Sequence, residues 1–200
     1  MARPVNGVAA MAALLLVAVV CVAVPARAQP PLVTIDSVTF TGSGCNWGNT
    51  NYVLSNDYKI LTVLFGGMIA TTDSGLAGKR KNCQISLGLK YPNGFSLTLG
   101  KVTGRGFADV GYSSTGTYQT SYYISGQTGT SYATRTIQGQ FTGNYEFTDE
   151  LSRLIWSNCN NAPNLNINSE VRVNGKKAVM TLDSSDQKFE LSFSIDWLAC

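Results

Sequence analysis

Apolar and polar side chains alternate along several stretches of this chain. In the clearest stretch, residues 188–197, every second side chain is large and apolar. Residues 84–91 repeat the pattern, and residues 165–173 repeat it with Ser169 as the one interruption on the apolar face. A period of two is typical of a half-buried antiparallel strand, with one face against a core and the other in water.

Turn-forming residues separate these stretches. Pro92-Asn93-Gly94 predicts a hairpin between two apolar runs, and the apolar positions on either side of Ser37 are out of phase, which predicts a β-bulge there. Residues 58–70 are apolar in both phases and predict a strand inside a sheet. We count about ten or eleven short strands, and at most one helical turn, at residues 149–154. The pattern predicts an all-β protein, a single antiparallel β-sandwich that is jelly-roll-like.

The first 28 residues differ from the rest. Arg3 precedes an uninterrupted apolar run over residues 8–24, and Pro25 and Ala26-Arg27-Ala28 follow it. This order is typical of a secretory signal peptide, so we expect a leader at residues 1–28 and a secreted domain at residues 29–200. The alternative is a membrane anchor, since the run is near the short end of what spans a bilayer. The small-residue cleavage pattern favours removal, and with it no membrane contact in the mature form.

An oxidising compartment decides how the cysteines are interpreted. Of the five cysteines, Cys21 lies in the leader, and Cys45, Cys83, Cys159 and Cys200 remain. An even number in a secreted chain predicts two disulfides. We favour the sequential pairing, Cys45 with Cys83 and Cys159 with Cys200, because the second bond would hold the C-terminus. A free or intermolecular Cys200 is the alternative.

Composition excludes several kinds of chemistry. The chain has no histidine, which removes histidine-activated nucleophiles, histidine general acid–base catalysis and histidine-ligated zinc or copper. We therefore predict no cofactor and no metal. Loss of the leader would lower the net charge from +3 to +1, too little to attract nucleic acid. The run Lys79-Arg80-Lys81 is compatible with a processing site, an anionic-polysaccharide contact or a solvated loop.

Aromatic residues supply the best candidates for ligand binding. Tyrosine presents an apolar face and a polar tip, which suits it to stacking against a sugar ring. Five tyrosines lie in the polar–aromatic segment 112–141, and four of them are candidates together with a tryptophan that follows the first cysteine of the secreted domain. The candidate ligand contacts are Tyr118, Tyr122, Tyr123, Tyr132 and Trp47. The alternative is that the tyrosines pack in or over the core, and that Trp47 covers a disulfide.

Carboxylates are the only plausible acid–base groups. Glu146, Asp149 and Glu150 cluster near one predicted turn, and Glu146 is the foremost catalytic candidate among them. A glycosidase needs two carboxyl groups about 5–10 Å apart across a cleft. No pair here has a spacing that predicts such an arrangement, so charged residues of a solvent-exposed face remain the stronger interpretation.

Several short segments resemble one protein family. They occur in family order and are Thr41-Gly42-Ser43-Gly44-Cys45, Arg80-Lys81-Asn82-Cys83-Gln84, Leu89-Lys90-Tyr91-Pro92, Tyr122-Tyr123-Ile124-Ser125-Gly126-Gln127, Trp156-Ser157-Asn158-Cys159, Leu165-Asn166-Ile167-Asn168 and Trp197-Leu198-Ala199-Cys200. The chain is similar in these segments to the small secreted proteins of fungi and bacteria grouped as domain of unknown function 4360. The resemblance implies secretion, a β-rich fold and disulfides, and it implies no catalytic residues. Gly66-Gly67 departs from the family, whose members often carry an acidic residue there.

Three hypotheses for the function follow. The first is a non-catalytic protein that binds a polysaccharide or cell-wall glycan, or acts at a surface. The second is a histidine-free carbohydrate-active enzyme, a glycosidase or lyase. The third is a structural protein that associates with itself through a sheet edge. The sequence does not determine the ligand or the oligomeric state.

Overall fold

A computed structural model describes residues 29–182 and 190–200 of the chain. The leader expected at residues 1–28 lies outside this part. Within the described residues, the strands and the two short helices are β1 (Thr34–Thr41), β2 (Thr50–Leu54), β3 (Ile60–Phe65), β4 (Ile69–Thr71), η1 (Thr72–Ser74), α1 (Gly75–Gly78), β5 (Arg80–Lys90), β6 (Phe95–Val110), β7 (Thr115–Ile124), β8 (Ser131–Gln138), β9 (Phe141–Glu150), β10 (Asn164–Asn174), β11 (Ala178–Thr181) and β12 (Glu190–Ala199).

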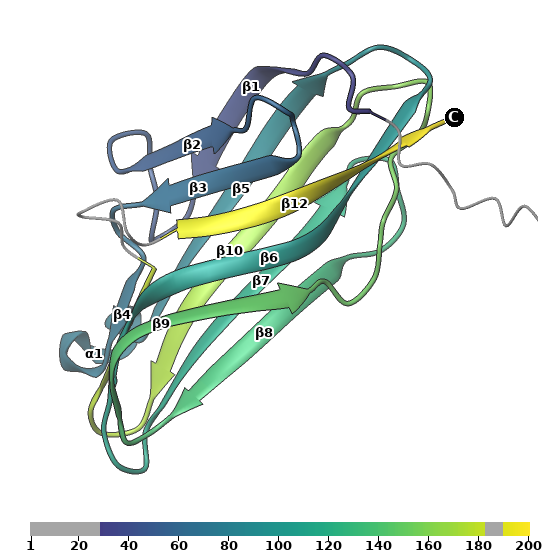
Figure 1. Cartoon of the computed structure of the whole chain (residues 1–200). Helices are drawn as coiled ribbons and strands as arrows, with labels where there is room; N and C mark the ends of the chain where they lie inside the picture. The colour runs from purple at the N-terminus through teal and green to yellow at the C-terminus, as the bar shows by residue number, and fades with distance from the viewer. Residues whose placement is uncertain (1–28, 183–189) are drawn as a thin grey trace, which may run out of the picture.

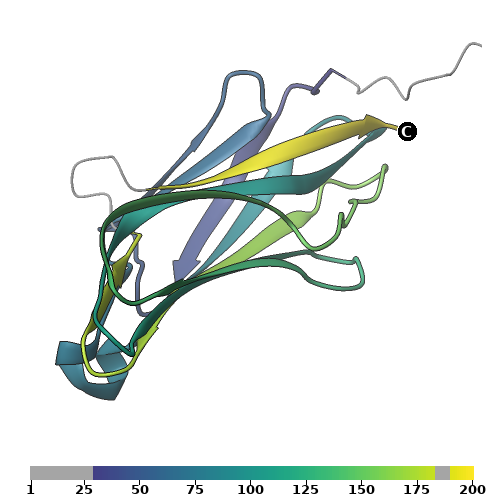
Figure 2. The same cartoon turned by 60° about the horizontal axis from the view of Figure 1, so that its bottom comes forward.

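The strands form two antiparallel sheets that pack face to face (Figures 1 and 2). The five-stranded sheet has the order β1-β5-β10-β7-β8. The seven-stranded sheet has the order β2-β3-β12-β6-β11-β4, and β9 pairs with β6 along the opposite edge of that strand. The predicted antiparallel β-sandwich is therefore confirmed. No helix in the described part is long and apolar enough to cross a bilayer.

The period-two stretches lie where the pattern predicts. In β12, Leu191, Phe193, Ile195 and Trp197 are buried and the residues between them are partly exposed. The predicted bulge is present, since the pairing of β1 with β5 shifts register between Ile35 and Ser37. Strand β3 pairs with β2 on one side and β12 on the other, so it lies inside its sheet, as its doubly apolar sequence predicts.

Two local predictions are wrong. The Pro92-Asn93-Gly94 turn does not close a hairpin, because β5 and β6 belong to different sheets. Its hydrogen bonds go to the second disulfide instead: Gly94 N donates to Cys159 O at 2.9 Å and Gly94 O accepts from Cys200 N at 2.8 Å. The helical turn expected at residues 149–154 is also absent, because β9 continues to Glu150 through its pairing with β6.

Glycines in β6 leave room for aromatic side chains of the neighbouring strand β9. A Cβ at Gly104 would lie 2.4 Å from Cζ of Phe147, and one at Gly106 would lie 2.5 Å from Oη of Tyr145. Each glycine is paired in register with the aromatic residue that covers it. The aromatic rings thus fill the space left by missing side chains, a known means of stabilising glycines in sheets.

Both disulfides follow the sequential pairing. The Cys45–Cys83 bond attaches the β1–β2 loop to β5, and the Cys159–Cys200 bond attaches the β9–β10 loop to the C-terminus. Each closes a loop of similar length, with sequence separations of 38 and 41 residues. In the chain-entropy description, a loop of that size contributes about 4 kcal/mol of stability.

Candidate functional site

A groove of ≈ 560 Å³ lies at the edge of the sandwich where the β1–β2 loop meets strand β2. Its aromatic wall consists of Phe40 from the end of β1, Trp47 from the loop and Tyr52 from β2. The rings of Phe40 and Trp47 meet edge to face, with centroids 4.9 Å apart, and Tyr52 lies 6.3 Å from Phe40. Phe40 is buried while Trp47 is 65% exposed. Trp47 therefore presents a large ring to solvent from a fixed position.

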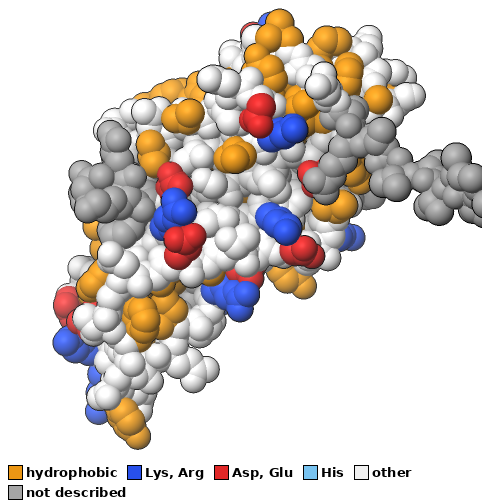
Figure 3. Space-filling model, in the orientation of Figure 1, with side chains coloured by type: hydrophobic (Ala, Val, Ile, Leu, Met, Phe, Trp, Pro, Cys, Tyr) orange, Lys and Arg blue, Asp and Glu red, His pale blue; other side chains and the backbone are white. Residues whose placement is uncertain are grey.

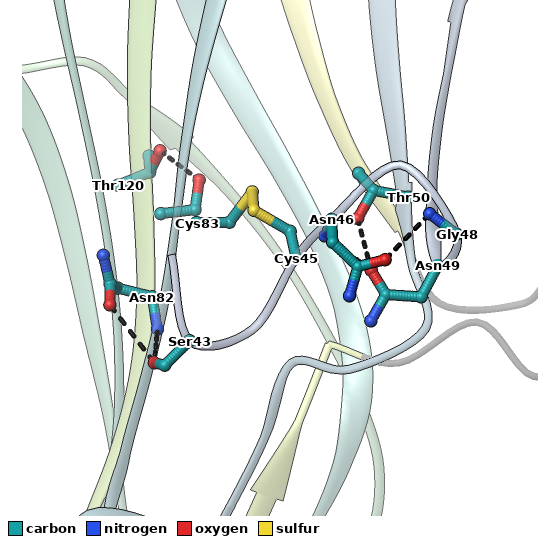
Figure 4. Close-up of a disulfide and its surroundings, with 10 residues drawn as sticks. Ser43, Cys45, Asn46, Gly48, Asn49, Thr50, Asn82, Cys83 and Thr120 are labelled. Carbon is teal, nitrogen blue, oxygen red and sulfur yellow. Dashed lines mark hydrogen bonds between the residues drawn. A yellow bond between two sulfur atoms is a disulfide. The ribbon is translucent and has the colours of Figure 1, made fainter. Parts of the chain in front are cut away.

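The loop that carries Trp47 is held from both ends (Figure 4). The Cys45–Cys83 disulfide anchors its start, and Asn49 organises its end: Asn49 Oδ1 accepts hydrogen bonds from Asn46 N at 2.8 Å and from Thr50 Oγ1 at 3.0 Å. Asn46 Oδ1 accepts from Gly48 N at 2.8 Å. These bonds use amide oxygens, and among the described residues no hydrogen bond engages the side-chain nitrogens of Asn46 and Asn49. Of the two, Asn49 lines the groove beside the aromatic wall.

The glycine pair that departs from the resembled family has a structural role here. A Cβ at Gly67 would lie 2.7 Å from Nδ2 of Asn49, and one at Gly66 would lie 3.0 Å from the Asn49 carbonyl oxygen. Gly66 N also donates to that carbonyl oxygen. A larger residue would displace Asn49, so the glycines and the amide-rich loop fit each other.

Two of the predicted ligand contacts are wrong. Tyr118 and Tyr122 are fully buried on the inner face of β7 and cannot reach a ligand. The hydroxyl of Tyr122 joins the two sheets: it lies 2.9 Å from Thr98 Oγ1, donates to Leu99 O at 3.1 Å and accepts from Ile155 N at 3.0 Å. Period two places both tyrosines on one face, but it does not say whether that face points inward.

Tyr118 has no such connections. Its ring packs against Phe147 with centroids 4.7 Å apart, and among the described residues no hydrogen bond engages its buried hydroxyl. Burial raises the pKa of Tyr118 well above its usual value, because the charged phenolate would be poorly solvated there. Tyr118 is a core residue.

The other two tyrosines point the opposite way. Tyr123 is 40% exposed and Tyr132 is 54% exposed, and both lie on the outer face of the five-stranded sheet. Tyr132 is paired in register with Ser121, two residues before Tyr123 on β7. The two rings are therefore diagonal neighbours on one surface, within the reach of aromatic side chains.

The three carboxylates predicted to cluster are divided between two faces of β9. Glu146 and Glu150 point outward and form ion pairs with Arg105 at 3.1 Å and with Lys101 at 3.7 Å. Asp149 points the other way and accepts hydrogen bonds from Arg135 of β8, from Nε at 2.8 Å and from Nη2. They do not form a catalytic pair across a cleft.

A second hollow, of ≈ 490 Å³, brings Glu150 together with a carboxylate that sequence analysis did not single out, Asp196 of β12. Gly100 forms part of its wall, because a Cβ there would lie 2.6 Å from Asp196 Oδ2. Lys101 and Arg153 also line it, so the hollow holds charges of both signs. No group of three or more side chains suited to hold a metal ion occurs in the described part of the chain.

Fold and site define a disulfide-braced antiparallel β-sandwich with an aromatic and amide-lined groove at one edge. A family model described as Domain of unknown function (DUF4360) matches residues 31–200, and the chain belongs to this family. A protein of Arthroderma benhamiae named "Uncharacterized secreted protein" is 35% identical over 180 residues, which cover 86% of this chain and 74% of that protein. The chain is a secreted protein, as its leader-like N-terminus predicts.

Two solved structures show distant similarity. One is TmCBM61 in complex with β-1,4-galactotriose, with a TM-score of 0.32 and 10% identity over 83% of this chain and 90% of that one. The other is the family 11 carbohydrate-binding module from Clostridium thermocellum in complex with a β-1,3-1,4-mixed-linked tetrasaccharide. It has a TM-score of 0.24 and 8% identity over 86% of this chain and 88% of that one.

Proposed function

We propose that this protein is a non-catalytic binder of extracellular glycans and that the Trp47 groove holds a neutral sugar. The observation that carries the proposal is the exposed Trp47 ring, fixed against Phe40 in a groove that Asn49 and Asn51 also line. A pyranose ring has an apolar face of C–H groups and a rim of hydroxyls. The first suits an indole ring, and the second suits asparagine side chains.

Charge supports a neutral ligand. Among the described residues, none that lines the groove is charged, and the polar groups present are amides, two hydroxyls, the indole N–H and backbone atoms. Neutral hydroxyls can pair with such groups without the desolvation cost of a buried ion. Fixation of the loop by a disulfide and by Asn49 lowers the entropy lost on binding, which raises affinity without added contacts.

The test is the substitution Trp47→Ala in the mature protein. A glycan array first identifies neutral oligosaccharides that bind, and calorimetric titration then compares the variant with wild type. We expect about 30-fold weaker binding, which corresponds to about 2 kcal/mol for a central aromatic contact. Tyr112→Ala is the matched control, since Tyr112 is 80% exposed in the turn after β6, outside the groove. Unchanged affinity in the Trp47 variant, or binding of charged glycans alone, would contradict the proposal.

The hollow with Glu150 and Asp196 favours one alternative, a carbohydrate-active enzyme that uses two carboxylates. An assay for reducing-sugar release on every glycan that binds separates the two functions. We expect no release by wild type. Release that is abolished in Glu150→Gln, and retained in Glu146→Gln, would replace the non-catalytic proposal with a hydrolase centred on this hollow.

A further inference from the structure

The outer face of the five-stranded sheet carries an ordered array of neutral hydrogen-bonding side chains. The register places five of them in one row that crosses all five strands, from β1 to β8. In order, they are Thr41, Gln84, Asn168, Ser121 and Tyr132. With about 4.8 Å between neighbouring strands, this row is about 19 Å long.

A second row lies beside the first, about 7 Å along the strands. It consists of Thr39, Ser86, Asn166 and Tyr123, again in register across β1, β5, β10 and β7. Each row therefore ends in an exposed tyrosine on the β7–β8 side of the sheet. Hydroxyl and amide groups occupy the other positions of both rows.

The hydrogen-bonding capacity of the first row is unused inside the protein. In the described part of the chain, no hydrogen bond engages the side chains of Thr41, Gln84, Asn168 or Ser121. In the second row, Asn166 is buried, and its Nδ2 donates to Ser125 Oγ at 3.1 Å and to Asn164 O at 3.3 Å, so this amide is used inside the protein. The first row is thus free to bind water or a ligand along its whole length.

Among the described residues of this face, the charged ones lie beyond the two rows, and they are largely neutralised. At one end of the face, Arg80 Nε donates to Glu170 at 2.8 Å, with Arg172 beside that carboxylate. At the other end, Lys90 pairs with Asp36 at 2.6 Å. The centre of the face therefore has neither the basic charge that nucleic acid requires nor the apolar core typical of a protein interface.

We propose that this face is a second binding surface, and that its ligand is an extended neutral polysaccharide lying across the strands. Sugar rings stack on Tyr123 and Tyr132, and successive hydroxyls pair with the exposed amides and hydroxyls of the two rows. A polymer suits the face because about 19 Å of repeating hydrogen-bonding groups exceeds the reach of one sugar. This inference rests on the proposed function for the class of ligand and is independent of the Trp47 groove.

The test is depletion of the mature protein from solution by three insoluble neutral polysaccharides: microcrystalline cellulose, chitin and insoluble β-1,3-glucan. Two double variants alter the face, Tyr123→Ala with Tyr132→Ala, and Gln84→Ala with Asn168→Ala. Tyr112→Ala controls for the loss of an exposed tyrosine. Thr103→Ala with Thr148→Ala controls for the loss of polar side chains on a sheet surface, because this pair lies on the seven-stranded sheet. Thermal unfolding of each variant confirms folding.

On at least one polymer, we expect each face variant to bind roughly tenfold more weakly than wild type, as the loss of two such contacts predicts. Both controls and Trp47→Ala should bind within about twofold of wild type. The inference would be overturned if the face variants bound every polymer as tightly as wild type does. It would also be overturned if wild type bound none of the polymers, or if Trp47→Ala were the only variant to lose binding. Titration with soluble oligosaccharides tests the groove separately. If Trp47→Ala does not weaken oligosaccharide binding while the face variants lose polymer binding, the proposal for the groove is contradicted and the proposal for the five-stranded face is supported.

Discussion

Tyr118 and Tyr122 form a natural matched pair, because both are fully buried on the same face of β7 and differ in their hydrogen bonds. The Tyr122 hydroxyl has three partners, and that of Tyr118 has none among the described residues. Phenylalanine at either position keeps the ring and removes only the oxygen. The two substitutions therefore separate the effect of hydrogen bonding from the effect of packing.

The expected magnitudes follow from this difference. At Tyr122, three bonds worth about 1 kcal/mol each are lost, and the buried N–H of Ile155 is left without its partner, so Tyr122→Phe should cost about 2–4 kcal/mol. For a domain of this size, that lowers Tm by about 5–15 °C. At Tyr118, removal of an unpaired buried hydroxyl should change stability by less than about 0.5 kcal/mol or increase it by up to about 1 kcal/mol.

Urea unfolding of the oxidised mature protein, followed by tryptophan fluorescence, measures both free energies, and calorimetry gives Tm. An equal loss in the two variants would show that the shared effect is packing or polarity of the ring, and would refute the hydrogen-bond argument. A Tyr122→Phe protein as stable as wild type would refute it as well, since the tie between the sheets would then contribute nothing.

Two further predictions concern redox state and pH. Under mild reductant without denaturant, alkylation and mass spectrometry should label Cys159 and Cys200 first, because Cys200 is exposed whereas Cys45 and Cys83 are buried; earlier labelling of the buried pair would contradict this. Because burial raises the pKa of Tyr118, the unfolded chain loses that proton first, so stability should fall as the pH rises above about 10, by up to about 1.4 kcal/mol per pH unit. Tyr118→Phe should reduce this decline, and an unchanged slope of Tm against pH would count against the assignment.

Periodicity was enough to predict the layers of this fold, because alternation shows which residues share a strand face, and a face of large apolar side chains packs against the core. The inward positions of β12 and β10 and the bulge beside Ser37 follow from the sequence alone. The pairing partners do not. Residues 92–94 have strong turn chemistry, yet they join strands of different sheets, because the turn chemistry is local whereas the partner of β6 is β12, about a hundred residues away in sequence.

The candidate site was only partly predictable for the same reason. Trp47 could be proposed from its loop position, and Tyr123 and Tyr132 from their residue type. Phe40 and Tyr52 could not, because the contacts of Phe40 with Trp47 and with Tyr52 depend on how the loop folds between two sheets. A cluster of asparagines around an isolated tryptophan, followed by a glycine pair, is the sequence signal that could have indicated the groove.

The two outer faces of the sandwich differ in a way that packing alone does not require. On the seven-stranded sheet, acidic and basic side chains alternate and pair, as Figure 3 shows. Arg105 lies between Glu146 and Glu190, and Lys101 lies beside Glu150. Exposed ion pairs of this kind contribute little stability and mainly keep a surface soluble and resistant to association.

On the five-stranded sheet, the central rows instead hold neutral amides and hydroxyls with exposed tyrosines at one end. Such side chains contribute little to strand stability, and asparagine is depleted in strands because it competes for backbone hydrogen bonds. Three asparagines at alternate positions of β10 are therefore locally unfavourable, in a strand whose inward positions are mostly branched apolar residues. A local conflict of this kind is expected where a surface serves binding rather than folding, which is why the five-stranded face, and not the charged one, is the surface to test against polysaccharide.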